Sequence, residues 1–171
     1  RGRNTGPHII INGAGNHNYG FILRNGNNIV RGVAMQDFKT AHISVASDDN
    51  KVEDSWFGLS DDGMRLSAGD TVTTEGGGGV ALAGGVLRNS VLHNVFAGFF
   101  GAPVAIRGEN NVFRGNKVGT RFDGRVPLPA QFNQHPCLSG AWAGGSGITV
   151  EGYGNTIGGA ATVPGAAPGN V

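Results

Sequence analysis

The sequence has little of what several common folds and functions require. A single cysteine, Cys137, leaves no partner for an intramolecular disulfide. No apolar run approaches the roughly 18 to 20 residues that cross a bilayer, so we expect no membrane span. Charged residues make up only 15% of the chain, and 13 Lys and Arg are balanced by 12 Asp and Glu without a basic cluster. This balance argues against nucleic acid as a partner.

Helical periodicity is also scarce. Glycine supplies 32 of the 171 residues and interrupts nearly every window in which apolar residues could recur at helical spacing. The 39% of hydrophobic residues is still enough for a folded core, and the length fits one domain over residues 1–171. Short alternating apolar segments followed by Gly, Asn or Asp indicate strands that end in turns. They lie at residues 8–11, 20–23, 42–45, 79–82, 103–106 and 147–150.

An asparagine followed two positions later by Val, Ile or Phe recurs along the chain. The positions seven and five before it are apolar in nine of ten cases, and the position seven after it is apolar in four of five. Asn16 is a further candidate start of the series, because Ile9 and Ile11 precede it at the same spacing. The five clear copies, separated by 22, 39, 22 and 44 residues, are anchored by Asn28, Asn50, Asn89, Asn111 and Asn155.

This repeat predicts an all-β fold, a single-stranded parallel β-helix (a solenoid) with about 22 residues per turn and roughly six to eight turns. Successive turns would stack about 4.8 Å apart, so equivalent residues lie above one another. Asparagine suits an inner corner because it tolerates left-handed backbone conformations and its amide can bond to the next asparagine in the stack. We expect Gly32, Gly115 and Gly159, four positions after their anchors, to serve a similar corner.

The segments NVFRGNKVGT and GITVEGYGNTIGG and the terminal GNV resemble the right-handed parallel β-helix repeats of secreted bacterial proteins in the pectate-lyase-like superfamily. The resemblance implies a right-handed coil and an extracellular or cell-surface location. It leaves the activity open, because the same coil carries polysaccharide lyases, hydrolases, epimerases, tailspikes and adhesins. Neither end reads as an amphipathic cap, so we also expect either a segment of a longer coil or end-to-end association of copies.

Two long intervals interrupt the repeat. Residues 60–79 fit either an excursion from the coil or an extra turn anchored by Asp70 with Val72, and we slightly favour the extra turn. Residues 121–145 read mainly as a long loop. The reason is that Pro127, Pro129 and Pro136 lack the amide donors of an inner strand.

The acidic residues suggest three kinds of site, although turn formation is the simpler interpretation for most of them. Asp61 and Asp62 are candidate catalytic carboxylates of a glycoside hydrolase. Adjacent residues on a strand point to opposite faces, so this pair cannot supply both the acid and the base on one face. Asp54 and His93 both replace glycine in the column four positions after the anchor. If residues 60–79 form an excursion, the two stack on neighbouring turns and could form an Asp–His pair. Calcium is the one cofactor considered, with oxygen ligands from Asp48, Asp49, Asp61 and Asp62.

Three aromatic residues are candidates for stacking on sugar rings, although packing of loops against the coil is the simpler role. Trp56 neighbours a core position and should point outward, while Phe132 and Trp142 belong to the long loop. We therefore predict a surface module with a structural or recognition role, binding polysaccharide or adhering to a surface. A polysaccharide lyase or hydrolase with an acidic site on the early turns is the main alternative. A self-associating fibre or surface-layer component is another.

Overall fold

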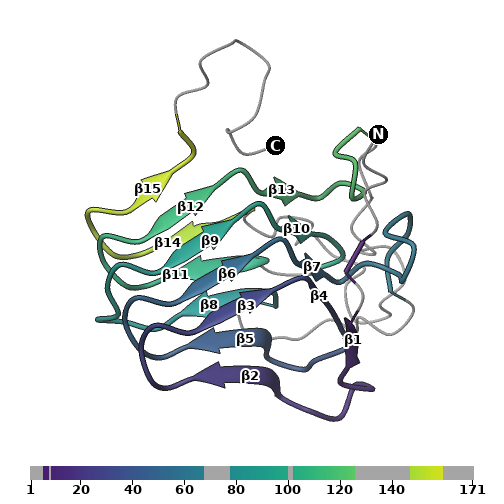
Figure 1. Ribbon diagram of the computed structural model, residues 1–171, viewed down its shortest axis with the longest axis horizontal. Coiled ribbons are helices and arrows are strands. Elements are labelled where there is room, and N and C mark those ends of the chain that lie inside the picture. Colours follow the sequence, from purple (N-terminus) through teal and green to yellow (C-terminus); the bar gives the residue numbers. More distant parts are fainter. Residues whose placement is uncertain (1–5, 8, 68–77, 100–101, 126–146, 160–171) are drawn as a thin grey trace, which may run out of the picture.

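Three parallel sheets of five strands each make up the described part of the protein (Figure 1). The computed structural model describes residues 6–7, 9–67, 78–99, 102–125 and 147–159, and no helix occurs among them. Sheet A contains β1 (Ile9–Asn12), β4 (Val33–Gln36), β7 (Trp56–Phe57), β10 (Val95–Phe96) and β13 (Lys117–Val118). Sheet B contains β2 (Tyr19–Leu23), β5 (Ala41–Val45), β8 (Val80–Leu82), β11 (Val104–Ile106) and β14 (Thr149–Val150). Sheet C contains β3 (Ile29–Arg31), β6 (Lys51–Glu53), β9 (Ser90–Leu92), β12 (Val112–Arg114) and β15 (Thr156–Ile157).

Each turn of the coil visits sheet B, then sheet C, then sheet A, as the strand numbering in Figure 1 shows. Phe21 pairs with Ile43 and Val91 with Phe113, so partners on these adjacent turns are 22 residues apart. The predicted all-β parallel β-helix is confirmed. Because each strand is only two to five residues long, every turn depends on its neighbours for backbone hydrogen bonds.

The predicted extra turn within residues 60–79 is wrong. Val52 on β6 pairs directly with Val91 on β9, 39 residues later, so the chain leaves the coil after β7 and returns at β8. Asp70 and Val72, the proposed anchor, lie outside the described residues. Likewise, Phe113 on β12 pairs with Ile157 on β15, so the segment between β13 and β14 adds no level there.

Two smaller predictions about the repeat also change. Ile9 pairs with Val33 and Ile11 with Met35, which places β1 in sheet A, so Asn16 does not anchor a copy as predicted. The described residues form five strand levels in each sheet, fewer than the six to eight turns predicted. The number of turns was overestimated because the prediction divided the chain by the repeat length and so included residues that leave the coil.

The core fills the space between the three sheets with stacked apolar columns. In sheet A, the rings of Phe57 and Phe96 lie parallel on adjacent levels, with centroids 4.8 Å apart and an interplanar angle of 10°. Met35 on the level before them and Phe113 on sheet C are also fully buried. Such columns arise because a parallel register puts identical repeat positions directly over one another.

Two columns of left-handed residues bracket sheet C and turn the chain into and out of it. The backbone angle φ lies between 50° and 68° in both columns, a region that Gly, Asn and Asp tolerate best. Gly32 and Gly115 occupy the predicted corner, but on the last level the left-handed residue is Gly158 instead of Gly159. The first column is Asn27, Asp49, Arg88, Asn110 and Gly154, and the second is Gly32, Asp54, His93 and Gly115.

A second layer covers the outer face of sheet A. Leu59 and Leu66 form an antiparallel bridge in the excursion after β7, and Phe122 follows β13. The backbone N–H of Phe122 donates to the carbonyl of Gly63 at 3.2 Å, which joins the two excursions. Together with Val95 and Ala97 of the coil, these side chains form a small apolar cluster outside the main core.

Candidate binding groove and its polar supports

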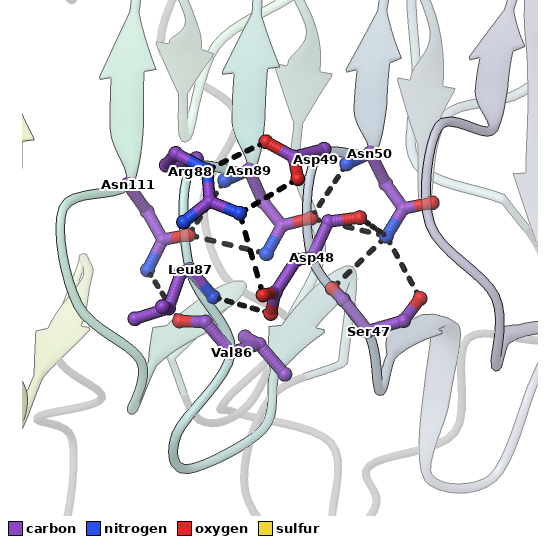
Figure 2. A network of polar contacts seen from close by, with 9 residues as sticks. All are labelled: Ser47, Asp48, Asp49, Asn50, Val86, Leu87, Arg88, Asn89 and Asn111. Atoms are coloured by element: carbon purple, nitrogen blue, oxygen red, sulfur yellow. Dashed lines mark hydrogen bonds and ion pairs between the residues drawn. The ribbon is translucent and has the colours of Figure 1, made fainter.

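The five anchor asparagines form a continuous ladder along the coil. In each step the side-chain oxygen of one asparagine accepts the backbone N–H of the asparagine on the preceding level, at 2.8 to 3.0 Å. Figure 2 shows the middle of this ladder, from Asn50 through Asn89 to Asn111. The Asn50 amide also donates to the backbone carbonyls of Ser47 and Asp48, which closes the turn that leads into sheet C.

A second buried ladder lies five positions after the anchors and was missed in the sequence. The Oδ1 atom of Asn94 accepts the N–H of Ser55 at 3.0 Å, and Oδ1 of Asn116 accepts the N–H of Asn94 at 2.9 Å. Ser55, Asn94 and Asn116 are fully buried. The asparagines five residues after Asn89 and Asn111 were the available signal, but they recur in only two copies. Both ladders are structural, because their polar atoms are used within the coil.

A groove of about 430 Å³ lies between the left-handed corner and the layer that covers sheet A. Gly32, Asp54 and His93 line it from the corner, and Trp56 and Val95 line it from sheet A. Its remaining lining residues are Gly6, Pro7, Arg31, Lys117 and Phe122. The groove therefore spans several levels and gathers three of the candidates from the sequence, Asp54, His93 and Trp56.

Charged side chains form a chain of contacts that begins in the groove and continues beyond Arg31 onto β6. Nδ1 of His93 lies 3.9 Å from Oδ1 of Asp54, and Oδ2 of Asp54 lies 3.9 Å from Nε of Arg31. Nε of Arg31 donates to Oε1 of Glu53 at 2.6 Å, and Nζ of Lys51 lies 3.7 Å from the other Glu53 oxygen. Asp54 and His93 are both more than half exposed, so a ligand can reach them.

The aromatic side of the groove centres on Trp56. Its side chain leaves the outer face of β7, and its ring lies 5.4 Å from the ring of Phe122 with an interplanar angle of 30°. The ring is nevertheless only partly exposed, because the backbones of Gly6 and Gly63 also lie against it. Nζ of Lys117 donates to the carbonyl of Phe122 at 2.6 Å and fixes the far end of the wall. The other two aromatic candidates, Phe132 and Trp142, lie outside the described residues.

Asp61 and Asp62 line a different pocket, also of about 430 Å³, together with Asp37. Nε2 of Gln36 donates to Asp61 at 3.0 Å, and Nδ2 of Asn12 donates to Asp37 at 2.7 Å. The pKa of Asp62 is lowered, first by the hydrogen bond from the Ser60 hydroxyl and then by the backbone N–H of Met64. A lowered pKa keeps a carboxylate ionised, which suits turn formation and a general base more than a general acid.

The four candidate calcium ligands are divided between two places. Asp48 and Asp49 lie in the turn between β5 and β6, whereas Asp61 and Asp62 follow β7 in the layer outside sheet A. Arg88 donates to both carboxylate oxygens of Asp49 at 2.8 Å, and this bond lowers the pKa of Asp49 and raises that of Arg88 (Figure 2). Among the described residues no group of three or more His, Cys, Asp or Glu side chains is placed to hold a metal.

Comparisons with family models, curated proteins and solved structures give no match for this chain. The structure supports a parallel β-helix built from repeats, while the likeness of these repeats to the pectate-lyase-like superfamily rests on the sequence pattern alone. In the part of the chain that the structure describes, no helix is long and apolar enough to span a membrane.

Proposed function

We propose that this protein is an extracellular or cell-surface recognition module that binds a polysaccharide in the groove beside sheet A. The observation that carries the proposal is the groove itself. It puts the Trp56 and Phe122 ring pair next to the exposed polar side chains of Asp54 and His93. Sugar rings present an apolar face and a rim of hydroxyl groups, and a site with aromatic walls and a few convergent polar groups suits both features.

The coil supports this role by keeping the groove rigid. Asp54 and His93 project from corners that are locked by left-handed backbone and by the buried Ser55 and Asn94 ladder immediately after them. Trp56 is held on β7, which pairs with β4 and β10 on either side. Binding residues on strands and fixed corners keep their geometry without a ligand, which lowers the entropic cost of binding.

Calorimetric titration with polygalacturonate, xylohexaose and cellohexaose tests the proposal. Lys117→Met removes a cationic wall residue of the groove. The matched control is Lys39→Met, on an exposed residue outside it. We expect Lys117→Met to weaken binding of the preferred glycan by about tenfold, equal to about 1.4 kcal/mol, and Lys39→Met to leave it unchanged. Equal affinities of parent and Lys117→Met, or no binding of any glycan by the parent, would contradict the proposal.

The pocket that contains Asp37, Asp61 and Asp62 keeps glycoside hydrolysis as a second candidate function. It holds carboxylates from two turns, which a hydrolase needs for its acid and base. Turnover of the same three glycans by the parent, abolished in the double variant Asp61→Asn/Asp62→Asn, is expected if the protein is an enzyme. No product from any of them with the parent protein counts against this alternative.

Self-association is favoured by one further observation. On the first strand level, large apolar side chains of β1, β2 and β3 are exposed to solvent. They are Ile9, Ile10, Tyr19, Ile22 and Ile29. If copies stack through this level, sedimentation velocity will show a concentration-dependent shift that Ile22→Lys and Ile29→Lys together remove. A single monomeric boundary at all concentrations contradicts this alternative.

A further inference from the structure

Residues 6 and 7 lie against the outer face of sheet A beside Trp56 on β7, two strands beyond β1, the strand that follows them. They precede β1, the first strand of sheet A, yet they line the same groove as Lys117 and Phe122 on and after β13, the last strand of that sheet. We call residues 6–7 the strap. The strap therefore lies over sheet A as part of the groove wall instead of continuing the coil.

The strap lies against the six-membered ring of Trp56 and depends on a glycine to do so. A Cβ atom at Gly6 would come within 2.2 Å of Cη2 of Trp56 and within 2.8 Å of Cζ2. At Gly63 a Cβ would meet the same ring at 2.6 Å. With Phe122 also packed against it, the ring has three neighbours that a stacking ligand would have to share or replace.

The three neighbours of the ring are attached to the protein to different degrees. Gly63 donates its N–H to the carbonyl of Ser60 at 2.8 Å and accepts the N–H of Phe122 at 3.2 Å, so both are tied to the covering layer. Gly6 and Pro7 make no backbone hydrogen bond with the other described residues, and proline has no N–H to donate. Within the described residues the strap thus has fewer backbone attachments than Gly63 and Phe122, and we take it as the neighbour that is cheapest to displace.

We propose that the strap is a displaceable cover and that its place on Trp56 is the subsite for a pyranose ring. This inference rests on the function proposed above. It adds the position of one sugar ring, and it makes the strap a part of the chain that competes with that sugar for Trp56. When the strap leaves, the indole ring gains a free surface beside Asp54 and His93, and a sugar ring takes over the apolar contact. The apparent affinity for the glycan is then the intrinsic affinity multiplied by the fraction of molecules in which the strap is displaced.

The variant Gly6→Val tests this because a valine side chain cannot fit where even a Cβ meets the ring. Gly84→Val is the matched control, since a Cβ at Gly84 has no atom within 4 Å and the residue has no left-handed backbone angle. Both are made in the parent chain for the binding titrations, and in a Trp142→Phe background, where Trp56 is the one remaining tryptophan, for fluorescence. Acrylamide quenching of its fluorescence reports the exposure of the ring. Titration with polygalacturonate, xylohexaose and cellohexaose reports binding.

We expect Gly6→Val to raise the quenching constant and to tighten binding of the preferred glycan by about threefold or more, as removal of a competing closed state requires. Gly84→Val should change neither. Unchanged quenching in Gly6→Val would show that the strap is not displaced, which contradicts the proposal that it is a displaceable cover. Raised quenching with unchanged or weaker binding would show that the strap helps to form the site, which contradicts the proposal that a pyranose ring takes its place on Trp56. If none of the glycans binds to either protein, the proposed function and the sugar subsite both fail, while quenching alone still decides whether the strap moves.

Discussion

The imidazole ring of His93 lies directly against Gly115 on the next turn of the coil. A Cβ at Gly115 would come within 2.3 Å of Cδ2 and within 2.9 Å of Nε2 of that ring. Both residues have left-handed backbone, with φ of 54° and 66°. The glycine therefore serves two purposes, since it permits the corner and makes room for the side chain that lines the groove.

Gly115→Ala should lower the free energy of unfolding by about 1–2 kcal/mol through its left-handed backbone, with an added cost from the contact with His93. In a His93→Gly background that contact is gone, so the same change should cost about 1 kcal/mol less. Urea unfolding of the four proteins of this double-mutant cycle measures the difference. Additive effects would show that the ring and the glycine are independent.

The buried ladder predicts a large effect at Asn94. Its Nδ2 donates to the carbonyl of Val52 at 2.9 Å, and its Oδ1 accepts the N–H of Ser55. Asn94→Ala leaves both backbone groups buried without these partners and should cost about 2–4 kcal/mol. Asn25→Ala, in the exposed turn between β2 and β3, is the control and should change stability by less than about 0.5 kcal/mol. Similar unfolding midpoints for the two variants in urea would contradict the structural role of the ladder.

The ion pair between Asp49 and Arg88 predicts a pH-dependent contribution to stability. The hydrogen bond from Arg88 lowers the pKa of Asp49 in the folded state below its value in the unfolded chain. Its contribution is therefore present above the unfolded pKa of about 3.9 and is lost as the pH falls through the lower, folded value. Asp49→Asn keeps the shape and tolerates the left-handed backbone, so it should lower Tm by no more than about 3 °C at pH 6.

The difference in Tm between parent and Asp49→Asn should shrink as the pH falls below about 3.9 and through the lower, folded pKa of Asp49, because the carboxyl then becomes neutral like the amide. Thermal unfolding followed by circular dichroism at pH 6 and pH 2.5 makes the comparison. A constant difference at both values would mean that the substitution acts through packing and not through charge.

His93→Asn tests the contribution of the histidine to the proposed groove. Asparagine keeps a polar group and accepts a left-handed backbone, but it lacks the ring that faces Asp54 at 3.9 Å. We expect binding of the preferred glycan to weaken by about threefold to tenfold, while Tm changes little. His17→Asn, on an exposed turn residue outside the groove, should leave binding unchanged. Equal binding by both variants would remove His93 from the site.

Much of the coil could be predicted because most copies of its repeat carry the same residue types at the same positions. The anchor asparagines and the apolar positions before and after them recur at fixed offsets, and a parallel coil is the arrangement that stacks such positions in register. Phe21 over Ile43 and Val30 over Val52 follow directly from that period. The ladder from Asn28 to Asn155 follows from the same period, since stacked asparagines can each bond to the backbone of the turn before.

The long intervals could not be resolved in the same way, because spacing counts residues and does not show where the backbone travels. The 39 residues between Asn50 and Asn89 fit two short turns as well as one turn with an excursion. The direct pairing of Val52 with Val91 decides for the excursion. That choice brings Asp54 to His93 and Asp49 to Arg88.

The sequence by itself thus determined the coil and its polar ladder, since both depend on contacts between equivalent positions of a regular repeat. Only the tertiary structure decided which side chains share the groove. Trp56, Phe122 and the strap come from different parts of the chain, and they meet because segments that leave the coil fold back over sheet A. No local pattern encodes such a meeting, because it depends on how irregular segments pack onto a rigid face.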